Sequence, residues 1–293
     1  MSKIKYNKFS CDVCGSDATI KIDIVKFYNQ KESIEVCKNC GFVFCQNRRD
    51  SEVMKNDWKK KIYKNKFDSL TYDSKNPAVY ARLTYALEFL KKNVHLRGKT
   101  LCDVGAGKGE FIQFLRDSSL GLKEIYGVEL SDENNEILEN KLINCFNGGI
   151  EEFVISKSFR KFDIISLNWT LENTQSAKNC LEHCNKMLNS HGHLLISTGS
   201  RILVPFKKPL KYYIPRDSHL DIQPFRFSAN SISALLNNAG FGEFIINRYI
   251  DTDYLCIIAK KLEKKPKKIV SCDDPKKIVE FFNRWHLESE HYE

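Results

Sequence analysis

Apolar and polar positions along the chain follow two patterns: short apolar runs, and stretches with apolar residues every three or four positions. In the clearest case, residues 99–131, the apolar runs Thr100–Val104 and Glu124–Leu130 flank a glycine-rich turn and a helical stretch. The apolar residues of that stretch share one helical face: Phe111, Ile112, Phe114 and Leu115. The pattern predicts a strand, a turn, a helix and a second strand, with both strands buried in a parallel sheet.

The same alternation continues along the chain and predicts an α/β domain over residues 76–262. Its first helix starts at Asn76-Pro77, an N-cap residue followed by proline at the first helical position. The later elements are expected in this order: helix Asp132–Asn140, strand Lys141–Phe146, strand Phe162–Leu167, helix Ser176–Leu188, strand Leu194–Thr198, helix Ser231–Ala239, and an antiparallel hairpin of Phe244–Tyr249 and Tyr254–Ala259. Strands that alternate with helices predict a parallel sheet covered by helices.

The turn after the first strand has almost no side-chain bulk, because Gly105, Ala106, Gly107 and Gly109 occupy it. Glu129, which ends the second strand, follows Gly109 by 20 positions. A carboxylate there can accept hydrogen bonds from both ribose hydroxyls of a nucleoside, while the bare backbone approaches the other end of the ligand. Position 110 is glutamate instead of the third glycine of a dinucleotide fingerprint, and no GK[ST] follows. The unit therefore predicts a nucleoside-containing cofactor without a pyrophosphate.

The segment Asp103–Gly109, DVGAGKG, resembles the first motif of class I S-adenosylmethionine (SAM) methyltransferases. The resemblance covers residues 76–262 and implies a Rossmann-like α/β fold with a seven-stranded sheet. The cofactor contacts that it implies at the first two strands are Asp103, Gly105, Ala106, Gly107, Glu129 and Leu130. Among these, the glycines line the methionyl part of SAM and Glu129 holds the ribose. An ordinary βαβ turn, whose glycines only permit tight packing, stays the alternative.

The resemblance also assigns a segment to the adenine edge of the cofactor, Gly148–Glu151. Family members usually have an acidic residue where this chain has Gly149. A backbone group or the Glu151 carboxylate is expected to replace that contact, and Ile150 and Glu151 are the expected cofactor neighbours.

Two further cofactor contacts are expected at the carboxyl end of the fourth strand, Asn168 and Trp169. The family often has HxLEH in this region, whereas this chain has WTLEN. Trp169 fits a contact with the cofactor and packing against a helix equally well. The family often folds the segment before the first helix over the site as a lid, which implies that Tyr72 is a cofactor neighbour.

The first 45 residues contain two CxxC pairs, Cys11/Cys14 and Cys37/Cys40, each followed by glycine. Each pair fits a zinc knuckle, in which a tight turn directs two thiolates at one metal ion. Residues 1–45 are therefore predicted to form a zinc-ribbon-like domain that needs its structural Zn²⁺ to fold. Redox-active pairs are the competing interpretation, which the absence of a thioredoxin-like βαβ unit disfavours. Loss of the metal is expected to unfold this lobe and to leave the nucleoside site largely formed.

Two segments flank the predicted catalytic domain. Residues 46–75 are basic with interleaved aromatic residues and are expected to form a lid or linker, although single-stranded nucleic acid is another partner for such a pattern. Residues 263–293 contain a lysine-rich linker followed by an amphipathic helix. Its apolar stripe is expected to pack on the chain's own body or to form a homodimer: Ile278, Phe281, Phe282 and Trp285.

One histidine is placed where a general base could act. Ligands bind at the carboxyl ends of parallel strands, and His219 is the histidine that follows such an end. It lies in the long connection 199–228 and is predicted to be the general base, with a bystander role as the alternative. The connection's basic residues could hold a phosphorylated acceptor: Arg201, Lys207, Lys208, Lys211, Arg216 and Arg226.

Composition and charge narrow the class of protein. The 293 residues carry a net charge of +9, which suits an anionic substrate without requiring nucleic acid. The sequence has no apolar run long enough for a membrane span and no signal-peptide core at its N-terminus. With its 11 cysteines suited to a reducing compartment, the protein is expected in the cytoplasm.

The order of CxxC pairs, lid and SAM domain resembles bacterial methyltransferases of sugar and surface-polysaccharide pathways. This resemblance implies methylation of a sugar nucleotide or glycan precursor, with O-methylation favoured. A zinc-ribbon RNA base methyltransferase and a SAM-binding protein without catalysis stay open as alternatives. The sequence has no NPPY-type motif for methylation of an exocyclic amine, which disfavours the RNA alternative.

Overall fold

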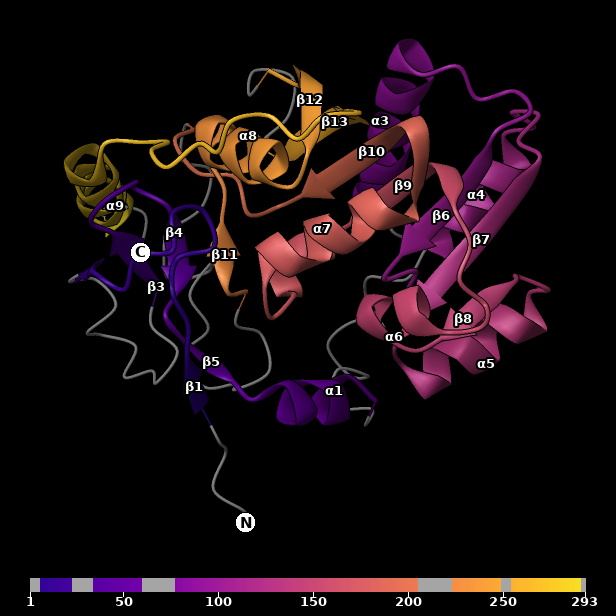
Figure 1. Cartoon of the computed structure of the whole chain (residues 1–293), viewed down its shortest axis with the longest axis horizontal. Coiled ribbons are helices and arrows are strands. Elements are labelled where there is room, and N and C mark those ends of the chain that lie inside the picture. Colours follow the sequence, from indigo (N-terminus) through magenta and orange to yellow (C-terminus); the bar gives the residue numbers. More distant parts are fainter. Residues whose placement is uncertain (1–5, 23–33, 60–76, 205–222, 249–253, 291–293) are drawn as a thin grey trace.

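The computed structural model describes residues 6–22, 34–59, 77–204, 223–248 and 254–290. A seven-stranded sheet forms its centre (Figure 1). The strands lie across the sheet in the order β12 (Phe241–Ile246), β13 (Leu255–Lys261), β10 (Leu188–Thr198), β9 (Phe162–Asn168), β6 (Thr100–Val104), β7 (Glu124–Glu129) and β8 (Cys145–Asn147). β13 runs antiparallel to both neighbours, and the other pairs are parallel. This confirms the predicted α/β fold, including its closing hairpin.

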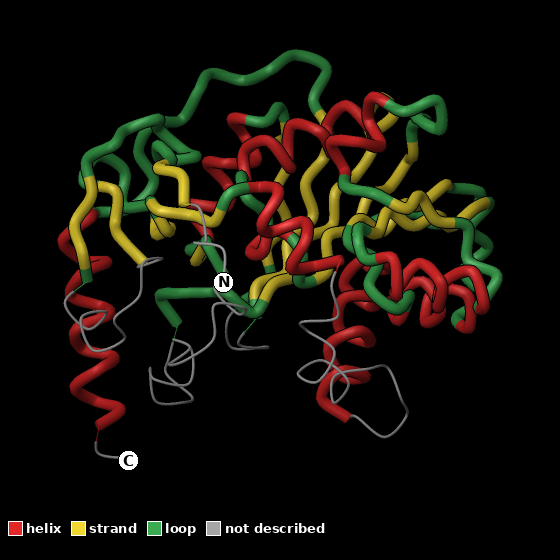
Figure 2. Tube along the Cα trace, turned by 90° about the horizontal axis from the view of Figure 1, so that it is seen from below, coloured by secondary structure: helices red, strands yellow, loops and turns green. Residues whose placement is uncertain are grey.

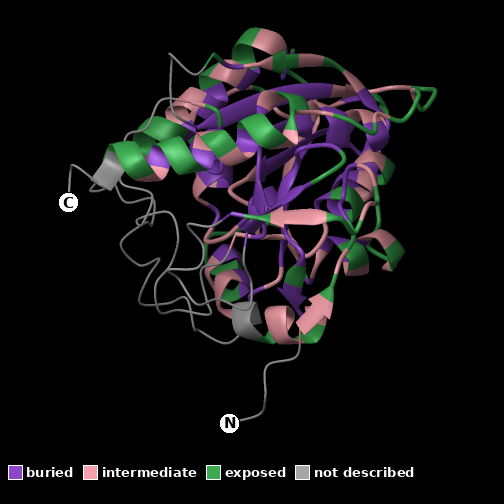
Figure 3. Ribbon diagram, turned by 90° about the vertical axis from the view of Figure 1, so that its left-hand side faces the viewer, coloured by how far each residue is buried: buried purple, intermediate pink, exposed green. Residues whose placement is uncertain are grey.

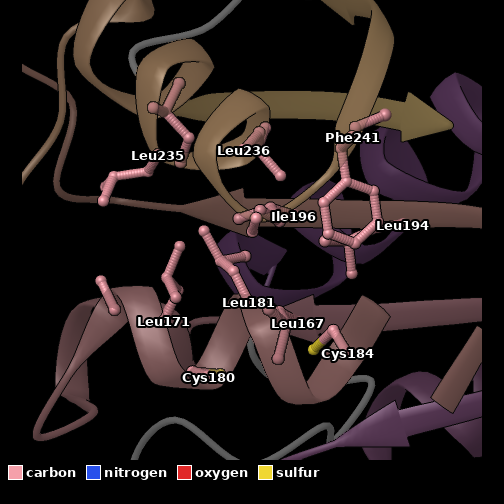
Figure 4. Close-up of a cluster of buried hydrophobic side chains, with 14 of the residues drawn as sticks. Leu167, Leu171, Cys180, Leu181, Cys184, Leu194, Ile196, Leu235, Leu236 and Phe241 are labelled. Carbon is pink, nitrogen blue, oxygen red and sulfur yellow. The ribbon is translucent and has the colours of Figure 1, made fainter. Parts of the chain in front are cut away.

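Helices cover both faces of this sheet. They are α3 (Pro77–Asn93), α4 (Glu110–Asp117), α5 (Asp132–Asn140), α6 (Ile150–Ile155), α7 (Ala177–Met187) and α8 (Ala229–Asn238). Successive side chains of a strand point to opposite faces, so Leu194 and Ile196 of β10 pack with α7 and α8 (Figure 4). Leu195 lies between them and packs on the other face with α3 and α4. The sheet is thus buried between two helical layers, and exposed residues lie on the outer sides of the helices (Figure 3).

Three strands of the central sheet begin several residues away from where the sequence predicts, and each difference has a local cause. β10 begins at Leu188 instead of Leu194, and its pairing with β9 is irregular between Leu188 and His193, where His191 has φ of 60°. β8 begins at Cys145 instead of Lys141, because Lys141 caps α5 and Leu142 turns the chain with φ of 54°. β12 begins three residues earlier than predicted, at Phe241. An irregularity with Glu243 at φ of 51° shifts its register and lets its first residues pair with β13. In all three cases a residue other than glycine has a positive φ angle, which the hydrophobic pattern does not reveal.

The cysteine-rich segment forms a four-stranded sheet that includes one strand from much later in the chain. Its strands are ordered β11 (Phe225–Arg226), β4 (Val43–Cys45), β3 (Ile34–Cys37) and β2 (Thr19–Lys21), and a separate pair consists of β1 (Tyr6–Lys8) and β5 (Asn47–Arg49). Phe42, Phe44 and Phe225 stack together and belong to the same apolar cluster as the α7 and α8 face of the central sheet. The lobe and the central domain therefore share one continuous core.

The last helix, α9 (Pro275–Glu290), packs on this lobe. Its residues Ile278, Phe282 and Trp285 are buried in a cluster with Ile34 and Val43 of the ribbon strands. Figures 1 and 2 both show α9 at the end of the molecule that carries the ribbon. The apolar stripe predicted from the sequence is thus buried on the chain's own body, one of the two expected partners.

Within residues 46–75 the structure describes β5 and α1 (Ser51–Lys59). Lys55 of α1 forms an ion pair of 3.0 Å with Glu152 of α6, which joins this segment to the predicted adenine edge. No helix in the described parts of the chain is both long and apolar enough to cross a membrane.

Candidate cofactor site and metal centre

The carboxyl ends of four neighbouring strands bring most of the predicted cofactor residues to one edge of the sheet. Gly105, Ala106 and Gly107 follow β6, and Ile150 and Glu151 follow β8. Glu129 ends β7 and Leu130 follows it, while Asn168 ends β9 and Trp169 follows it. β6 lies between β7 and β9, so the strand order reverses at this point, where ligands bind in open α/β sheets. Tyr72 and His219 lie outside the described residues, and their roles stay predictions.

Two glycines of the loop lie where a side chain would clash with its neighbours. Gly109 has φ of 79° and is buried, and a Cβ at this position would lie 2.6 Å from Leu138 Cδ2. Gly105 has φ of 72° and is exposed, and a Cβ there would lie 2.5 Å from the Thr170 hydroxyl oxygen. Both glycines therefore permit close packing, Gly109 against Leu138 of α5 and Gly105 against Thr170, and Gly105 is also exposed at the sheet edge.

Glu129 faces this loop from the end of the neighbouring strand. Its Oε2 accepts a hydrogen bond of 2.8 Å from the Gly107 N–H, and its Oε1 accepts one of 2.8 Å from the Ser131 N–H. Oε1 also accepts a hydrogen bond of 3.4 Å from Asn134 Nδ2. Oε2 has capacity for one further hydrogen bond, so a ribose hydroxyl can still donate to it. Glu129 is 7% exposed, and burial raises its pKa.

Three carboxyl groups gather around the glycine loop: Asp103, Glu110 and Glu129. Burial raises the pKa of each of them, and that of Asp103 reaches about 7. The charges of Glu110 and Glu129 also raise the Asp103 pKa, which shows that the groups interact. Such a cluster attracts a cationic ligand and repels a phosphate. The charge of the site therefore suits a sulfonium and an ammonium group, as SAM carries.

Asp103 is held by hydrogen bonds from a neighbouring strand. Its Oδ1 accepts hydrogen bonds from the Ser166 hydroxyl at 2.6 Å and from Asn168 Nδ2 at 3.0 Å. Asn168 Oδ1 in turn accepts a hydrogen bond of 2.7 Å from the Ser197 hydroxyl. Asn168 is therefore fixed between β6 and β10, and its side chain links the carboxyl ends of three adjacent strands.

Trp169 adopts a backbone conformation that is rare for an aromatic residue. Its φ of 50° lies in the left-handed region, where strain is tolerated mainly at functional sites and tight turns. Its ring stacks on Tyr254 with centroids 5.9 Å apart, and the Arg82 guanidinium lies 5.5 Å from its centre. The packing interpretation of Trp169 is thus observed, and its contact with the cofactor stays a prediction.

The predicted adenine edge has a carboxylate close to the position of the missing acid. A Cβ at Gly149 would lie 3.2 Å from Glu151 Oε2. Glu152 Oε2 is already engaged, because it accepts a hydrogen bond of 2.7 Å from the Gly149 N–H. Glu151 is exposed, so its carboxylate is available to replace the side chain that Gly149 lacks.

The four cysteines of the CxxC pairs come together as the sequence predicts. Their Sγ atoms all lie within 4.8 Å of one another, and the Cys11–Cys40 and Cys14–Cys37 pairs are each 3.5 Å apart. Zn–S bonds of about 2.3 Å in a tetrahedral site place sulfur atoms about 3.8 Å apart, so the cluster fits one Zn²⁺. Cys45 is buried elsewhere, in the cluster that packs against α9. Four thiolates leave no open position, which suits a structural ion.

Residues 72–242, more than half of the chain, match the model of a protein family described as a methyltransferase domain. The chain belongs to this family. The match spans the glycine loop, Glu129 and the carboxyl end of β9, and so it confirms the methyltransferase domain expected from DVGAGKG.

Two curated relatives are ubiquinone biosynthesis O-methyltransferases. The mitochondrial enzyme of Dictyostelium discoideum is 25% identical over 142 residues, which cover 43% of this chain and 44% of the relative. The enzyme of Coxiella burnetii is 26% identical over 147 residues, which cover 46% of this chain and 61% of the relative. The chain thus spans about half the length of these relatives. Their names refer to ubiquinone biosynthesis, so the likeness to sugar methyltransferases stays a prediction.

One solved structure shares the fold of the methyltransferase domain of this chain. It is the 1,6-didemethyltoxoflavin N1-methyltransferase of Burkholderia thailandensis, with bound 1,6-didemethyltoxoflavin and S-adenosylhomocysteine. The TM-score is 0.51 at 17% identity, over 73% of this chain and 89% of that chain.

Sequence reasoning missed a buried carboxyl group beside the site, Glu172. It is fully buried, and neither of its oxygens has a hydrogen-bond partner within the described part of the chain. Burial raises its pKa to about 7, even though nearby Thr198 and Arg226 lower that pKa. The position lies within WTLEN, but its burial depends on contacts of this segment with β10 and β11, which the local sequence does not reveal.

Two of the basic residues expected to hold a phosphorylated acceptor make contacts within the chain. Arg201 donates hydrogen bonds to the side chain and backbone of Asn247, both at 3.2 Å. Arg226 donates to the backbone oxygens of Gln223 and Phe225, both at 2.9 Å. The four lysines and arginines between them, at positions 207, 208, 211 and 216, lie outside the described residues.

Proposed function

We propose that this chain is a SAM-dependent methyltransferase that acts on a small-molecule acceptor. The observation that carries the proposal is the acidic glycine loop, in which the exposed backbone of Gly105 lies beside the carboxyl groups of Asp103 and Glu129. Membership of the methyltransferase family supports it. The S-adenosylhomocysteine bound to the structural neighbour supports SAM as the ligand.

The residues at the sheet edge would bind and orient the cofactor. SAM supplies a methyl group activated by attachment to a sulfonium. Glu129 would accept a hydrogen bond from a ribose hydroxyl, and Glu151 would accept one from the adenine amino group. The carboxyl cluster would stabilise the positive charge of SAM and fix the orientation of the cofactor. Fixing the orientation of the reactants is the main contribution that an enzyme makes to an in-line displacement. His219 is the proposed base that takes the proton of an attacking hydroxyl.

We infer that the acceptor atom is oxygen, because both curated relatives are named O-methyltransferases. The first candidate acceptor is a nucleotide-activated sugar or glycan precursor, as the order of CxxC pairs and SAM domain predicts. The second candidate is a hydroxylated quinone precursor, which the names of the relatives favour. An RNA base is the third and has no comparable support.

A transfer assay with methyl-labelled SAM distinguishes these acceptors. The chain would be incubated with UDP- and dTDP-sugars, with hydroxylated quinone precursors and with RNA. The proposal predicts label on a small-molecule hydroxyl, and the labelled compound identifies the candidate. Label on RNA, with affinity that falls steeply with salt, would contradict both small-molecule candidates. SAM binding without transfer to any acceptor would indicate a binding protein without catalysis.

We propose that the four thiolates hold a structural Zn²⁺. Metal analysis of the purified chain should find one zinc per molecule. Retention of a full equivalent in Cys37→Ser would contradict the four-thiolate site.

A further inference from the structure

Asp12 lies between two of the four clustered cysteines, yet its side chain contacts the methyltransferase domain. Asp12 Oδ1 accepts hydrogen bonds from the Ser176 hydroxyl at 2.7 Å and from the Lys178 N–H at 3.2 Å. Ser176 is the N-cap residue of α7 and Lys178 lies in its first turn, where a negative charge also interacts favourably with the helix dipole. The turn that presents Cys11 and Cys14 to a metal ion therefore also caps this helix.

A buried arginine completes the contact. Arg48 is 1% exposed, and its Nη2 lies 2.8 Å from Asp12 Oδ2. Its other nitrogens donate to the backbone oxygens of Cys45 and Gln175, and its guanidinium lies 4.6 Å from the Phe225 ring centre. A buried pair of this kind is sensitive to the position of each partner, because a displaced partner leaves the other charge buried and unpaired.

The segment held by these two residues is the one that supports the cofactor site. Residues 169–176 connect the carboxyl end of β9 to α7. At one end, Gln175 Nε2 donates to the Arg49 backbone oxygen at 2.9 Å, in addition to the contact with Arg48. At the other end, the Thr170 hydroxyl donates to the Val104 backbone oxygen at 3.0 Å and lies against Gly105.

Hydrogen bonds within the segment join its two ends. Asn173 Nδ2 donates to the Trp169 backbone oxygen at 2.7 Å, and the Thr174 hydroxyl donates to the Leu171 backbone oxygen at 2.9 Å. The segment is therefore a short, internally bonded connection between the cysteine turn and the glycine loop. Displacement at Ser176 would be transmitted to Thr170, which borders Gly105.

We propose that Asp12 and Arg48 are positioning residues through which metal binding in the cysteine lobe strengthens SAM binding at the sheet edge. Metal binding orders the turn that contains Cys11 and Cys14, and the ordered turn places the Asp12 carboxylate against α7. The inference rests on the proposed function. It also replaces the expectation that metal loss leaves the nucleoside site largely formed, because the contacts described above tie that site to the lobe.

Coupling of this kind is reciprocal, so it can be measured from both sides. Calorimetry on the full chain gives the SAM affinity of the Zn²⁺-loaded and chelator-stripped forms. Competition with a chromogenic chelator gives the Zn²⁺ affinity with and without SAM. The proposal predicts that Zn²⁺ raises SAM affinity by about tenfold and that SAM raises Zn²⁺ affinity by the same factor. Equal SAM affinities for the two forms would overturn it.

Variants of Asp12 and Ser176 test whether these residues link the metal-binding turn to the SAM site or only stabilise the cysteine lobe. Ser176→Ala should bind Zn²⁺ in the absence of SAM as the parent chain does, because it changes neither a thiolate nor the Asp12–Arg48 pair. Asp12→Asn leaves the buried Arg48 charge unpaired and should bind Zn²⁺ more weakly. In both variants, the factor by which Zn²⁺ raises SAM affinity (the coupling factor) should fall toward one. Asp17→Asn is the matched control, since Asp17 is an exposed acid of the same lobe that accepts a hydrogen bond from Ser10 and should keep the full factor. A full coupling factor in Asp12→Asn would contradict the proposed role of Asp12.

A second measurement covers the case in which the metal-free chain unfolds. SAM affinity is then compared at full Zn²⁺ occupancy, where Asp12→Asn should weaken it by about tenfold and Asp17→Asn should not change it. Unchanged affinity in Asp12→Asn would overturn the inference and leave the proposed function standing. Absence of SAM binding by the Zn²⁺-loaded parent chain would instead refute the proposed function.

Discussion

At the scale of single residues, the site is notable for carboxyl groups whose burial opposes ionisation. Asp103 and Glu129 could be predicted from the sequence, because Asp103 lies near the end of the apolar run that leads into the glycine-rich turn and Glu129 ends the next strand. Glu172 could not, because its isolation depends on the packing of β10 and β11 around it. The same holds for Arg48, whose partner Asp12 lies 36 positions away in the chain.

The raised pKa of Glu172 predicts a pH-dependent effect on stability. Its pKa of about 7 in the folded chain exceeds the ordinary value of 4.5, so folding favours the protonated form. The free energy of unfolding therefore falls as pH rises from about 4.5 to about 7, by about 3 kcal/mol at most. Glu172→Gln has no proton to lose, and its decrease in stability between pH 5 and pH 8 should be smaller by about 2 kcal/mol.

Denaturant unfolding at pH 5 and pH 8 measures this difference. The control is Glu139→Gln, which alters an exposed carboxylate of α5 and should keep the parent's pH dependence. An identical decrease in stability for Glu172→Gln and the parent chain would show that Glu172 is not a source of this pH dependence.

The Asp103 pKa of about 7 predicts that SAM binding depends on pH. The positive charge of bound SAM favours the ionised form of the Asp103 carboxyl group. SAM binding below pH 7 therefore requires Asp103 to release a proton. SAM affinity should therefore rise between pH 6 and pH 8, by less than about tenfold per unit. S-adenosylhomocysteine, which lacks the sulfonium charge, should show a weaker dependence. Calorimetry at several pH values tests this, and equal pH dependence for SAM, S-adenosylhomocysteine and Asp103→Asn would contradict it.

At the scale of helices and strands, the long periodic elements could be predicted and the short ones could not. α4, α7 and α9 have apolar stripes that identify them in the sequence. β11 has two residues, too few for any period, and its pairing with β4 joins Phe225 to Phe44 across 181 positions. The sequence therefore shows the ribbon cysteines without showing that a later strand completes their sheet.

The contact of α9 with the ribbon yields a prediction for that helix. Phe282 is 3% exposed and packs in the cluster formed with β3 and β4. Phe282→Ala should destabilise the lobe by about 3–5 kcal/mol through lost burial and a cavity. Its Zn²⁺ should then be lost to a chelator faster than in the parent chain.

Leu287→Ala is the control on the same helix, because Leu287 is 61% exposed. Its effect on stability should stay within about 0.5 kcal/mol. Equal retention of Zn²⁺ in Phe282→Ala and Leu287→Ala would show that α9 does not support the lobe.

At the scale of the whole molecule, the cysteine lobe and the methyltransferase domain form one body. β11 and the apolar cluster that contains Cys37, Phe42 and Leu194 cross between them. The alternation of strands and helices predicts the α/β fold, and the spacing of the CxxC pairs predicts the four-thiolate cluster. The seven-stranded sheet and most residues at its edge are implied by the resemblance of DVGAGKG to the first methyltransferase motif. The sequence does not predict how the cysteine lobe packs on the methyltransferase domain, because that packing depends on contacts between distant segments.

The central claim is that the glycine loop and Glu129 bind the adenosyl part of SAM. Calorimetric titration of the parent chain and of Glu129→Ala with SAM, and with NADH for comparison, tests it most directly. The account predicts SAM binding by the parent chain, no binding of NADH, and SAM affinity lower by about ten- to a hundredfold in Glu129→Ala, through loss of charge-assisted hydrogen bonds. Unchanged SAM affinity in Glu129→Ala, or binding of NADH in place of SAM, would contradict it.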